Sequence, residues 1–376
     1  MAEVLGADTI LALALPTGVD GDRIAQWAMR DGTTYQQVIS SLSLALAGLN
    51  SELAQMHGFW MSLTEEPNFE YPDGGSVTDL PEITDVDDPD AISGTTLGHM
   101  IDLRVYGAAI GGSKRYFRDA RMPRLRSSVK TLVLQAKHRF DKKLFTRFFS
   151  NTENAVGSGY DVPFVRGTGG NVDYTPIAMG GEAFSSSHDH FIGLDSGSKG
   201  FDDVVEESIE HLAEHGHEGP YDMWVSKTDV DAGSYHSLAD FIEFTAPVAT
   251  RIDRGGSTTG NDFFAQGNPN LFGVIGYYQS RYGQVNLHAT SRIPTGYAGA
   301  WKSYGNLDSR NPLAVRVHPD EGFGVRVIPE TTNDNKYPIK KLNIEFEFGV
   351  SVGEDRTNGV VSYLVSGGTY ANPTIS

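Results

Sequence analysis

The chain has 376 residues, a formal net charge of −18 and no cysteine. This length predicts two or three compact units with a sizeable core. The lack of cysteine excludes disulfides, Fe–S clusters, thiolate zinc sites and a cysteine nucleophile. An excess of 48 acidic over 30 basic residues argues against a free-standing nucleic-acid-binding protein, because phosphate contacts require a basic surface.

The first 63 residues predict amphipathic helices. Residues 20–63 carry apolar side chains at helical spacing, among them Leu42, Leu46 and Leu49. The apolar run Ile10–Leu15 is too short to cross a bilayer and follows acidic rather than basic residues, so it predicts neither a membrane span nor a signal peptide. We therefore expect a soluble protein made in the cytoplasm.

Residues 64–102 form a strongly acidic segment. They include eleven acidic residues, four prolines and the pair Gly74-Gly75, but no Lys or Arg. Proline interrupts helices because it lacks the backbone N–H and its ring clashes with the preceding turn. The composition predicts an extended, protruding segment rather than a packed core.

The following stretch, residues 104–147, reverses the charge. It holds thirteen basic residues against only Asp119 and Asp141. Apolar residues recur every three or four positions from Leu125 to Phe148, which predicts one long helix over Arg124–Phe149. A helix of about 24 residues is roughly 36 Å long.

The middle of the chain predicts mixed packing of helices and strands. A helical pattern over residues 203–215 is followed by a strand over Tyr221–Lys227 and by another helix that begins at Asp229. A further strand is expected over Leu271–Tyr278. This order indicates an α+β or α/β unit.

The C-terminal third has the clearest strand pattern. Apolar residues alternate with polar ones over Leu342–Val352, which predicts a strand with one buried face. The turn residues 353–359 lead into Val360–Val365, which we expect to be the partner strand of a β-hairpin. A third strand is expected over Phe323–Val327.

The sequence offers weak candidates for metal sites and no enzyme motif. His211 and His215 share a helix face, as zinc or iron ligands do. The alternative is a polar helix face whose imidazoles lie near a helix C-terminus, where positive charge is stabilised. The residues Asp85, Asp87, Asp88 and Asp90 lack the EF-hand pattern for calcium, so a solvated acidic loop is expected. We expect no catalytic residue, bound metal or cofactor.

The charge layout suggests contact between copies of the chain. An acidic segment is followed directly by a basic loop and helix. The acidic surface of one subunit can therefore contact the basic surface of the next, and such a contact can repeat from copy to copy. The alternative is that both charge runs are solvated faces. The residues expected at this inter-subunit interface are Glu65, Glu66, Glu70, Asp85, Asp87, Asp88, Arg115, Arg118, Arg121, Arg124 and Arg126.

The order of these parts resembles the major capsid proteins of tailed bacteriophages, which have the Hong Kong 97 fold. Local sequences that resemble that family are Phe323-Gly324-Val325, Phe346-Glu347-Phe348-Gly349-Val350, Arg356, Gly359-Val360-Val361 and Arg292–Tyr297. The resemblance implies an α+β fold. Its implied parts are an N-terminal arm (1–63), an extended loop (64–120), a spine helix with a peripheral domain (121–200), an axial domain (201–318) and peripheral return strands (319–376).

The resemblance also implies a function and partners. It implies a viral major capsid protein without catalytic activity, which self-assembles into hexamers and pentamers of an icosahedral shell around packaged double-stranded DNA. Implied partners are other copies, portal protein and scaffold or decoration proteins, with no membrane and no sequence-specific binding of DNA. The implied location is the virion, after assembly in the host cytoplasm. Lys114 lies where some members form a Lys–Asn cross-link, but no Asn partner matches.

Two alternatives remain open. An encapsulin-type nanocompartment shell has the same fold and encloses a protein cargo. A metalloenzyme that uses His188, His190, His211 and His215 belongs to another class.

Overall fold

The computed structural model describes residues 35–72, 96–113, 122–157, 160–168, 171–172, 188–243, 274–329 and 339–375. The chain divides into two compact units, each assembled from three stretches of sequence. Unit 1 comprises the described parts of Met1–Leu53, Arg104–Phe140 and Asp320–Phe348, and unit 2 comprises those of Ala54–Leu103, Asp141–Pro319 and Gly349–Ser376. Among the described residues, no helix is both long and apolar enough to cross a membrane.

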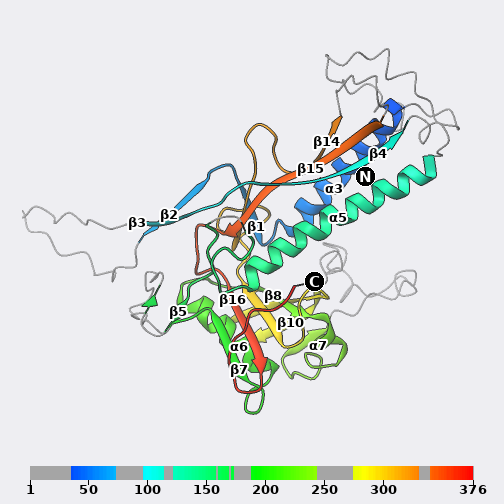
Figure 1. Ribbon diagram of the computed structural model, residues 1–376. Helices are drawn as coiled ribbons and strands as arrows, with labels where there is room; N and C mark the ends of the chain where they lie inside the picture. The colour runs from blue at the N-terminus through cyan, green and yellow to red at the C-terminus, as the bar shows by residue number, and fades with distance from the viewer. Residues whose placement is uncertain are drawn as a thin grey trace, which may run out of the picture. The chain divides into compact units, whose positions relative to one another are not determined.

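Unit 1 combines two long helices with a small antiparallel sheet. Its elements, some of which continue into unit 2, are α3 (Tyr35–His57), β4 (Arg104–Ser113), α5 (Met122–Phe149), β14 (Val325–Pro329) and β15 (Ile339–Val352). Within unit 1, β15 pairs with β14 along one edge and with β4 along the other. Figure 1 shows these strands alongside α3 and α5. The predicted long helix and the predicted strands around residues 325 and 342–352 are confirmed.

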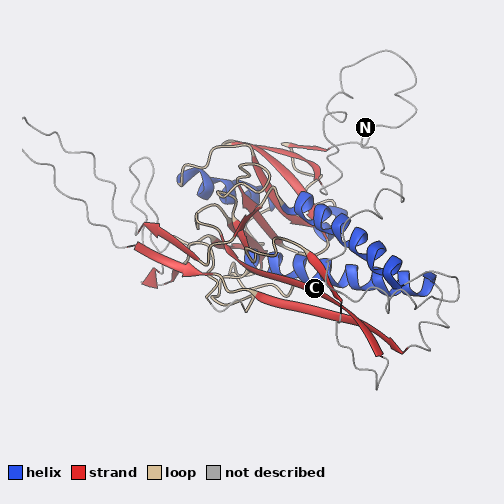
Figure 2. Cartoon of the chain, turned by 90° about the horizontal axis from the view of Figure 1, so that it is seen from above, coloured by secondary structure: helices blue, strands red, loops and turns tan. Residues whose placement is uncertain are grey.

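The core of unit 1 follows from the helical and strand periods of its sequence. Leu46, Leu49 and Leu53 lie three or four residues apart on α3 and are all buried. Phe346 and Phe348 alternate with glutamates on β15 and contact Phe140 of α5, with ring centroids 5.5 and 5.1 Å apart. An ion pair between Lys137 Nζ and Glu52 Oε1 joins the two helices, which Figure 2 shows from above.

Unit 2 is built on a seven-stranded mixed sheet. Its strands, in spatial order, are β7 (Phe191–Asp195), β16 (Val360–Val365), β12 (Tyr297–Trp301), β8 (Tyr221–Ser226), β11 (Gly283–Thr290), β10 (Val274–Ser280) and β9 (Phe241–Glu243). The helix α6 (Phe201–Glu214) packs its apolar face on this sheet through Val204, Val205, Ile209 and Leu212, which are all buried. The predicted helix 203–215 and the strand at 221 are confirmed.

Smaller elements complete unit 2. The parallel pair β1 (Met61–Thr64) and β13 (Leu313–Arg316) continues to the end of β15. The antiparallel ribbon β2 (Asn68–Pro72) and β3 (Thr96–Met100) is visible in Figure 1. The short strands β5 (Gly167–Thr168) and β6 (Asn171–Val172) form a separate pair. A second aromatic core contains Trp60, Phe145, Phe148, Trp224 and Trp301.

The structure corrects the predicted C-terminal hairpin. β16 does not pair with β15 but lies between β12 and β7 in the seven-stranded sheet. The edges of β15 are occupied by β4, β13 and β14. The continuous apolar sequence Val360-Val361 fits a central strand that is covered on both faces, and strand periodicity does not specify which strand is the partner.

Two further boundaries differ from the expectation. The helix expected from Asp229 is only α7 (Lys227–Asp231), because Gly233 at φ 80° directs the chain into a turn soon after it. The stretch Arg104–Ser113 was expected within the extended loop, but it forms strand β4 and pairs with β15 over its whole length.

Candidate functional site

The predicted inter-subunit charges lie only partly in the described structure. Glu65, Glu66 and Glu70 are exposed, between β1 and β2 or on β2. Asp85, Asp87, Asp88, Arg115, Arg118 and Arg121 lie outside the described residues. Arg124 and Arg126 lie near the start of α5, where the structure describes the backbone alone. The acid–base contact between copies therefore stays a prediction.

The base of the β2–β3 ribbon is anchored firmly in unit 2. His99 of β3 is buried, stacks on Phe69 of β2 with centroids 5.4 Å apart, and donates from Nε2 to the Val352 carbonyl at 3.1 Å. Burial, and secondarily the charge of Arg356, lowers the pKa of His99 to about 4. The neutral imidazole thus fixes the ribbon to the end of β15.

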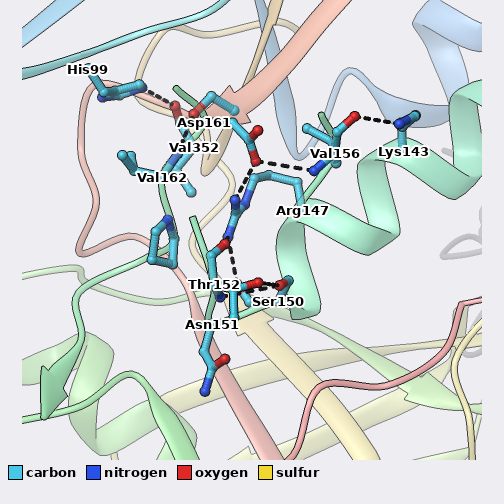
Figure 3. A network of polar contacts seen from close by, with 12 residues as sticks. His99, Lys143, Arg147, Ser150, Asn151, Thr152, Val156, Asp161, Val162 and Val352 are labelled. Carbon is cyan, nitrogen blue, oxygen red and sulfur yellow. Dashed lines mark hydrogen bonds and ion pairs between the residues drawn. The ribbon is translucent and has the colours of Figure 1, made fainter. Parts of the chain in front are cut away.

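A buried ion pair organises the loop that follows α5 (Figure 3). Arg147 Nη1 lies 2.5 Å from Asp161 Oδ2, and both side chains are fully buried. Arg147 Nη2 also donates to the carbonyls of Ser150 at 2.6 Å and Thr152 at 3.0 Å, while Asp161 accepts from the Val156 N–H at 3.3 Å. These bonds satisfy charges that burial would otherwise penalise.

Sequence reasoning missed this role of Arg147. In the sequence, Arg147 is only one of the thirteen basic residues of the stretch 104–147. The available signal was its position in the last turn of α5 beside Phe148 and Phe149, which are themselves fully buried. A basic residue flanked by buried aromatic residues requires an internal partner.

Three histidines from two separate segments converge in unit 2. His188 and His190 lie just before β7, whereas His215 caps the C-terminus of α6. Their Nε2 atoms lie 2.8 Å (His190–His215), 2.9 Å (His188–His215) and 3.3 Å (His188–His190) apart. His190 and His215 are buried, and His188 is half-buried. The alternative metalloenzyme considered from the sequence uses these three residues together with His211, and the structure brings the three together.

His211, the fourth predicted member, does not join this group. Its Nδ1 donates to the Glu207 carbonyl at 2.9 Å, and its ring stacks on that of His188 with centroids 5.1 Å apart. The four-residue spacing of His211 and His215 on one helix face predicted that both are ligands, but only His215 belongs to the cluster.

The environment of the cluster favours neutral imidazoles. Burial, reinforced by neighbouring histidines, lowers the pKa of His188 to about 4 and that of His215 to about 3. The same two causes lower the pKa of His190 well below its ordinary value. At neutral pH the three side chains carry lone pairs that are available as acceptors or ligands.

Large apolar side chains are exposed on α3, β4, α5 and β14 of unit 1. They are Leu44 on α3 (52%), Val105 on β4 (59%), Leu134 on α5 (55%) and Ile328 on β14 (37%). Single exposed apolar residues are common on monomers, so each of these side chains taken alone requires no partner.

Comparison with other proteins shows a match of fold. No protein family and no curated protein matches the chain. A solved chain of Mycobacterium phage Patience matches with a TM-score of 0.59 and 20% sequence identity, over 96% of this chain and 97% of that chain.

Two capsid chains match at lower scores. The capsid of the native GTA particle has a TM-score of 0.44 and 14% identity, over 84% of this chain and 91% of that chain. The capsid of Ralstonia phage GP4 has a TM-score of 0.42 and 15% identity, over 85% and 92%. The match to the Patience chain shows that this chain has a fold that occurs in a bacteriophage, as the order of its elements in the sequence indicated.

Proposed function

We propose that this chain is a major capsid protein of the Hong Kong 97 type, which assembles as hexamers and pentamers into an icosahedral shell around double-stranded DNA. The observation that carries the proposal is the likeness to the Patience chain, which extends over nearly the whole length of both chains. In this proposal α5 is the spine helix, unit 1 is the peripheral domain, and the seven-stranded sheet with α6 forms the axial domain. The axial domain then includes β7 and β16, which lie outside the expected bounds 201–318.

The extended loop of this proposal starts from the β2–β3 ribbon. A loop that reaches over a neighbouring subunit needs a rigid base, and the His99 contact to Val352 supports such a base. The exposed carboxylates Glu65, Glu66 and Glu70 lie close to that base in sequence. We expect them to face basic residues at the start of α5 in the next subunit.

The energetics of assembly favour many weak contacts. An exposed ion pair contributes only about 0–1 kcal/mol, whereas apolar burial contributes about 25 cal/mol per Å². Leu44, Val105, Leu134 and Ile328 provide apolar surface for a second copy of the chain. The charge pairs then select orientation more than they supply affinity.

Electron microscopy of the expressed full chain tests the proposal. Closed shells are the expected result. If the chain stays monomeric even when a separate scaffold protein is supplied, the proposal is contradicted. DNA inside shells isolated from infected cells supports the capsid function, and a packaged enzyme supports the encapsulin alternative. The proposed role is structural, so no catalytic activity is assigned.

Charge reversal tests the proposed interface. The triple variant Glu65→Lys, Glu66→Lys, Glu70→Lys and the double variant Arg118→Glu, Arg124→Glu should each give soluble subunits with absent or distorted shells. Combining the two sets should restore shells in part, because opposite charges face each other again. The control Glu214→Lys changes an exposed residue at the end of α6. Normal shells from both reversed variants would contradict the charge contact.

A further inference from the structure

The three converging histidines cannot all be satisfied by hydrogen bonds to one another. A ring Nε2 either carries a proton and donates or carries a lone pair and accepts. With three mutually contacting nitrogens, at least two are of the same kind. At least one of the contacts at 2.8, 2.9 and 3.3 Å therefore joins two donors or two acceptors and is repulsive.

We propose that His188, His190 and His215 bind a divalent transition-metal ion, with Zn²⁺ as the preferred occupant. A cation replaces the repulsive contact by three attractive ones, because all three lone pairs then point at a single positive charge. Imidazole nitrogen is a preferred ligand of Zn²⁺, Ni²⁺, Co²⁺ and Cu²⁺. These three nitrogens can hold such an ion without rearrangement of the chain.

The spacing of the nitrogens fits such an ion. At a Zn–N distance of about 2.05 Å, tetrahedral coordination places ligand nitrogens about 3.3 Å apart. The His188–His190 distance of 3.3 Å meets this value, and the two distances to His215 are shorter by a few tenths of an ångström. Both short contacts involve His215, so a movement of its ring alone by a few tenths of an ångström equalises the three distances.

The surroundings of His190 are those of an oriented metal ligand. Its Nδ1 donates to the Gly359 carbonyl at 2.8 Å, which leaves the lone pair on Nε2 facing the other two histidines. The backbone of His190 is held on both sides, since its N–H donates to the Val165 carbonyl and its carbonyl accepts from Val361. A Cβ on Gly359 would lie 2.3 Å from the ring of Phe164, so this carbonyl can approach only from a glycine.

The ion would cross-link two segments of unit 2. It would join the segment before β7 to the C-terminal end of α6, since His190 and His215 are 25 positions apart in the sequence. Three protein ligands leave a fourth position, which a water molecule can fill. We assign the site to stability of the subunit, and this assignment does not depend on the proposed capsid function.

Metal binding by the full chain tests the proposal. The protein is stripped with a chelator, exchanged into chelator-free buffer and titrated with Zn²⁺. We expect it to retain an equimolar amount of Zn²⁺ after gel filtration. Its Tm should rise by about 5 °C when free Zn²⁺ exceeds the Kd about a hundredfold. A wild-type chain that retains no Zn²⁺ overturns the proposal.

Matched histidine variants locate the site. His188→Asn changes the half-buried ligand and should weaken Zn²⁺ binding by at least about tenfold, the scale on which even outer-sphere partners act. His211→Asn removes a neighbouring ring that is outside the cluster and should retain the ion. Equal binding by wild type and His188→Asn overturns the proposal.

A spectrum of the wild-type chain gives a readout that needs no variant. Co²⁺ should give the visible absorption of a tetrahedral site, and added Zn²⁺ should remove it. A Co²⁺-loaded chain with only the spectrum of octahedral hydrated Co²⁺ contradicts the site. This result is independent of shell assembly, so it is distinguishable from failure of the capsid proposal.

Discussion

Arg147 and Asp161 form an ion pair that has no exposed side-chain surface, with Nη1 2.5 Å from Oδ2. Burial lowers the pKa of Arg147, and the neighbouring carboxylate of Asp161 opposes that shift. Because the pair also holds the carbonyls of Ser150 and Thr152, it determines the course of the chain after α5.

Removal of one member of this pair should destabilise the subunit strongly. We expect Arg147→Met to lower the free energy of unfolding by about 3–5 kcal/mol, because Asp161 is left buried without its counter-ion. The double variant Arg147→Met, Asp161→Leu should lose less. Urea unfolding followed by circular dichroism measures both, with the exposed Lys227→Met as control. Equal unfolding curves for Arg147→Met and the control would show that the pair is unimportant.

A second prediction concerns the contact between α3 and β14. The Asn50 side chain donates from Nδ2 to the Val325 carbonyl at 3.2 Å and accepts from the Val325 N–H at 2.8 Å. Asn50→Ala leaves both backbone groups without this partner and should cost about 1–3 kcal/mol. The exposed Ser43→Ala on the same helix is the control, and a similar small loss in both variants would contradict the prediction.

Two glycines should respond oppositely to alanine. A Cβ on Gly299 of β12 would lie 2.5 Å from Phe148 Cε1, so Gly299→Ala should destabilise by about 1–3 kcal/mol through overpacking. Gly48 lies in the interior of α3 with nothing within 4 Å of a Cβ. Gly48→Ala should therefore stabilise by about 0.5–1 kcal/mol, since alanine loses less backbone entropy. Thermal unfolding of the two variants would reveal a shift of the same sign if this reasoning is wrong.

His99 is one of the groups that should make the free energy of unfolding fall in mild acid, together with the three clustered histidines. Its pKa is about 4 in the folded chain and 6.5 in the unfolded chain. Between these values the unfolded chain binds more protons, so stability is full above pH about 6.5 and declines as pH falls toward about 4. The loss reaches about 3 kcal/mol, at 1.36 kcal/mol per pKa unit.

The variant His99→Gln isolates this effect. Glutamine keeps an N–H donor for the Val352 carbonyl but does not titrate in this range. Unfolding measured across the range should show a shallower pH dependence in His99→Gln than in the exposed control His236→Gln. Parallel curves for the two variants would contradict the assignment to His99.

The repeat of apolar side chains predicted the helices and strands whose buried face can be identified from one continuous stretch of sequence. The helix expected over Arg124–Phe149 is α5 (Met122–Phe149), and the alternation over 342–352 lies within β15. Leu46 and Leu49 were expected on one face of a helix and both are buried. In each case the side-chain period alone identifies the inward face.

Strand partners and polar contacts could not be predicted in this way. The run Val360–Val365 was correctly identified as a strand, but its pairing with β12 and β7 depends on which edges other strands occupy. The charge of Arg147 gave no indication of its burial, because the aspartate that compensates it is on a later loop.

Side-chain periods predicted several of the long helices and strands, and the order of the parts carried the resemblance to bacteriophage capsid proteins. Only the tertiary structure shows that His188 and His190 lie against His215. These two residues, and not His211 of the predicted pair, are the partners of His215. Spacing along one helix restricts only which side chains share a face. Convergence of nitrogens from separate segments requires the packing of β7, α6 and β16, which is a property of the whole unit.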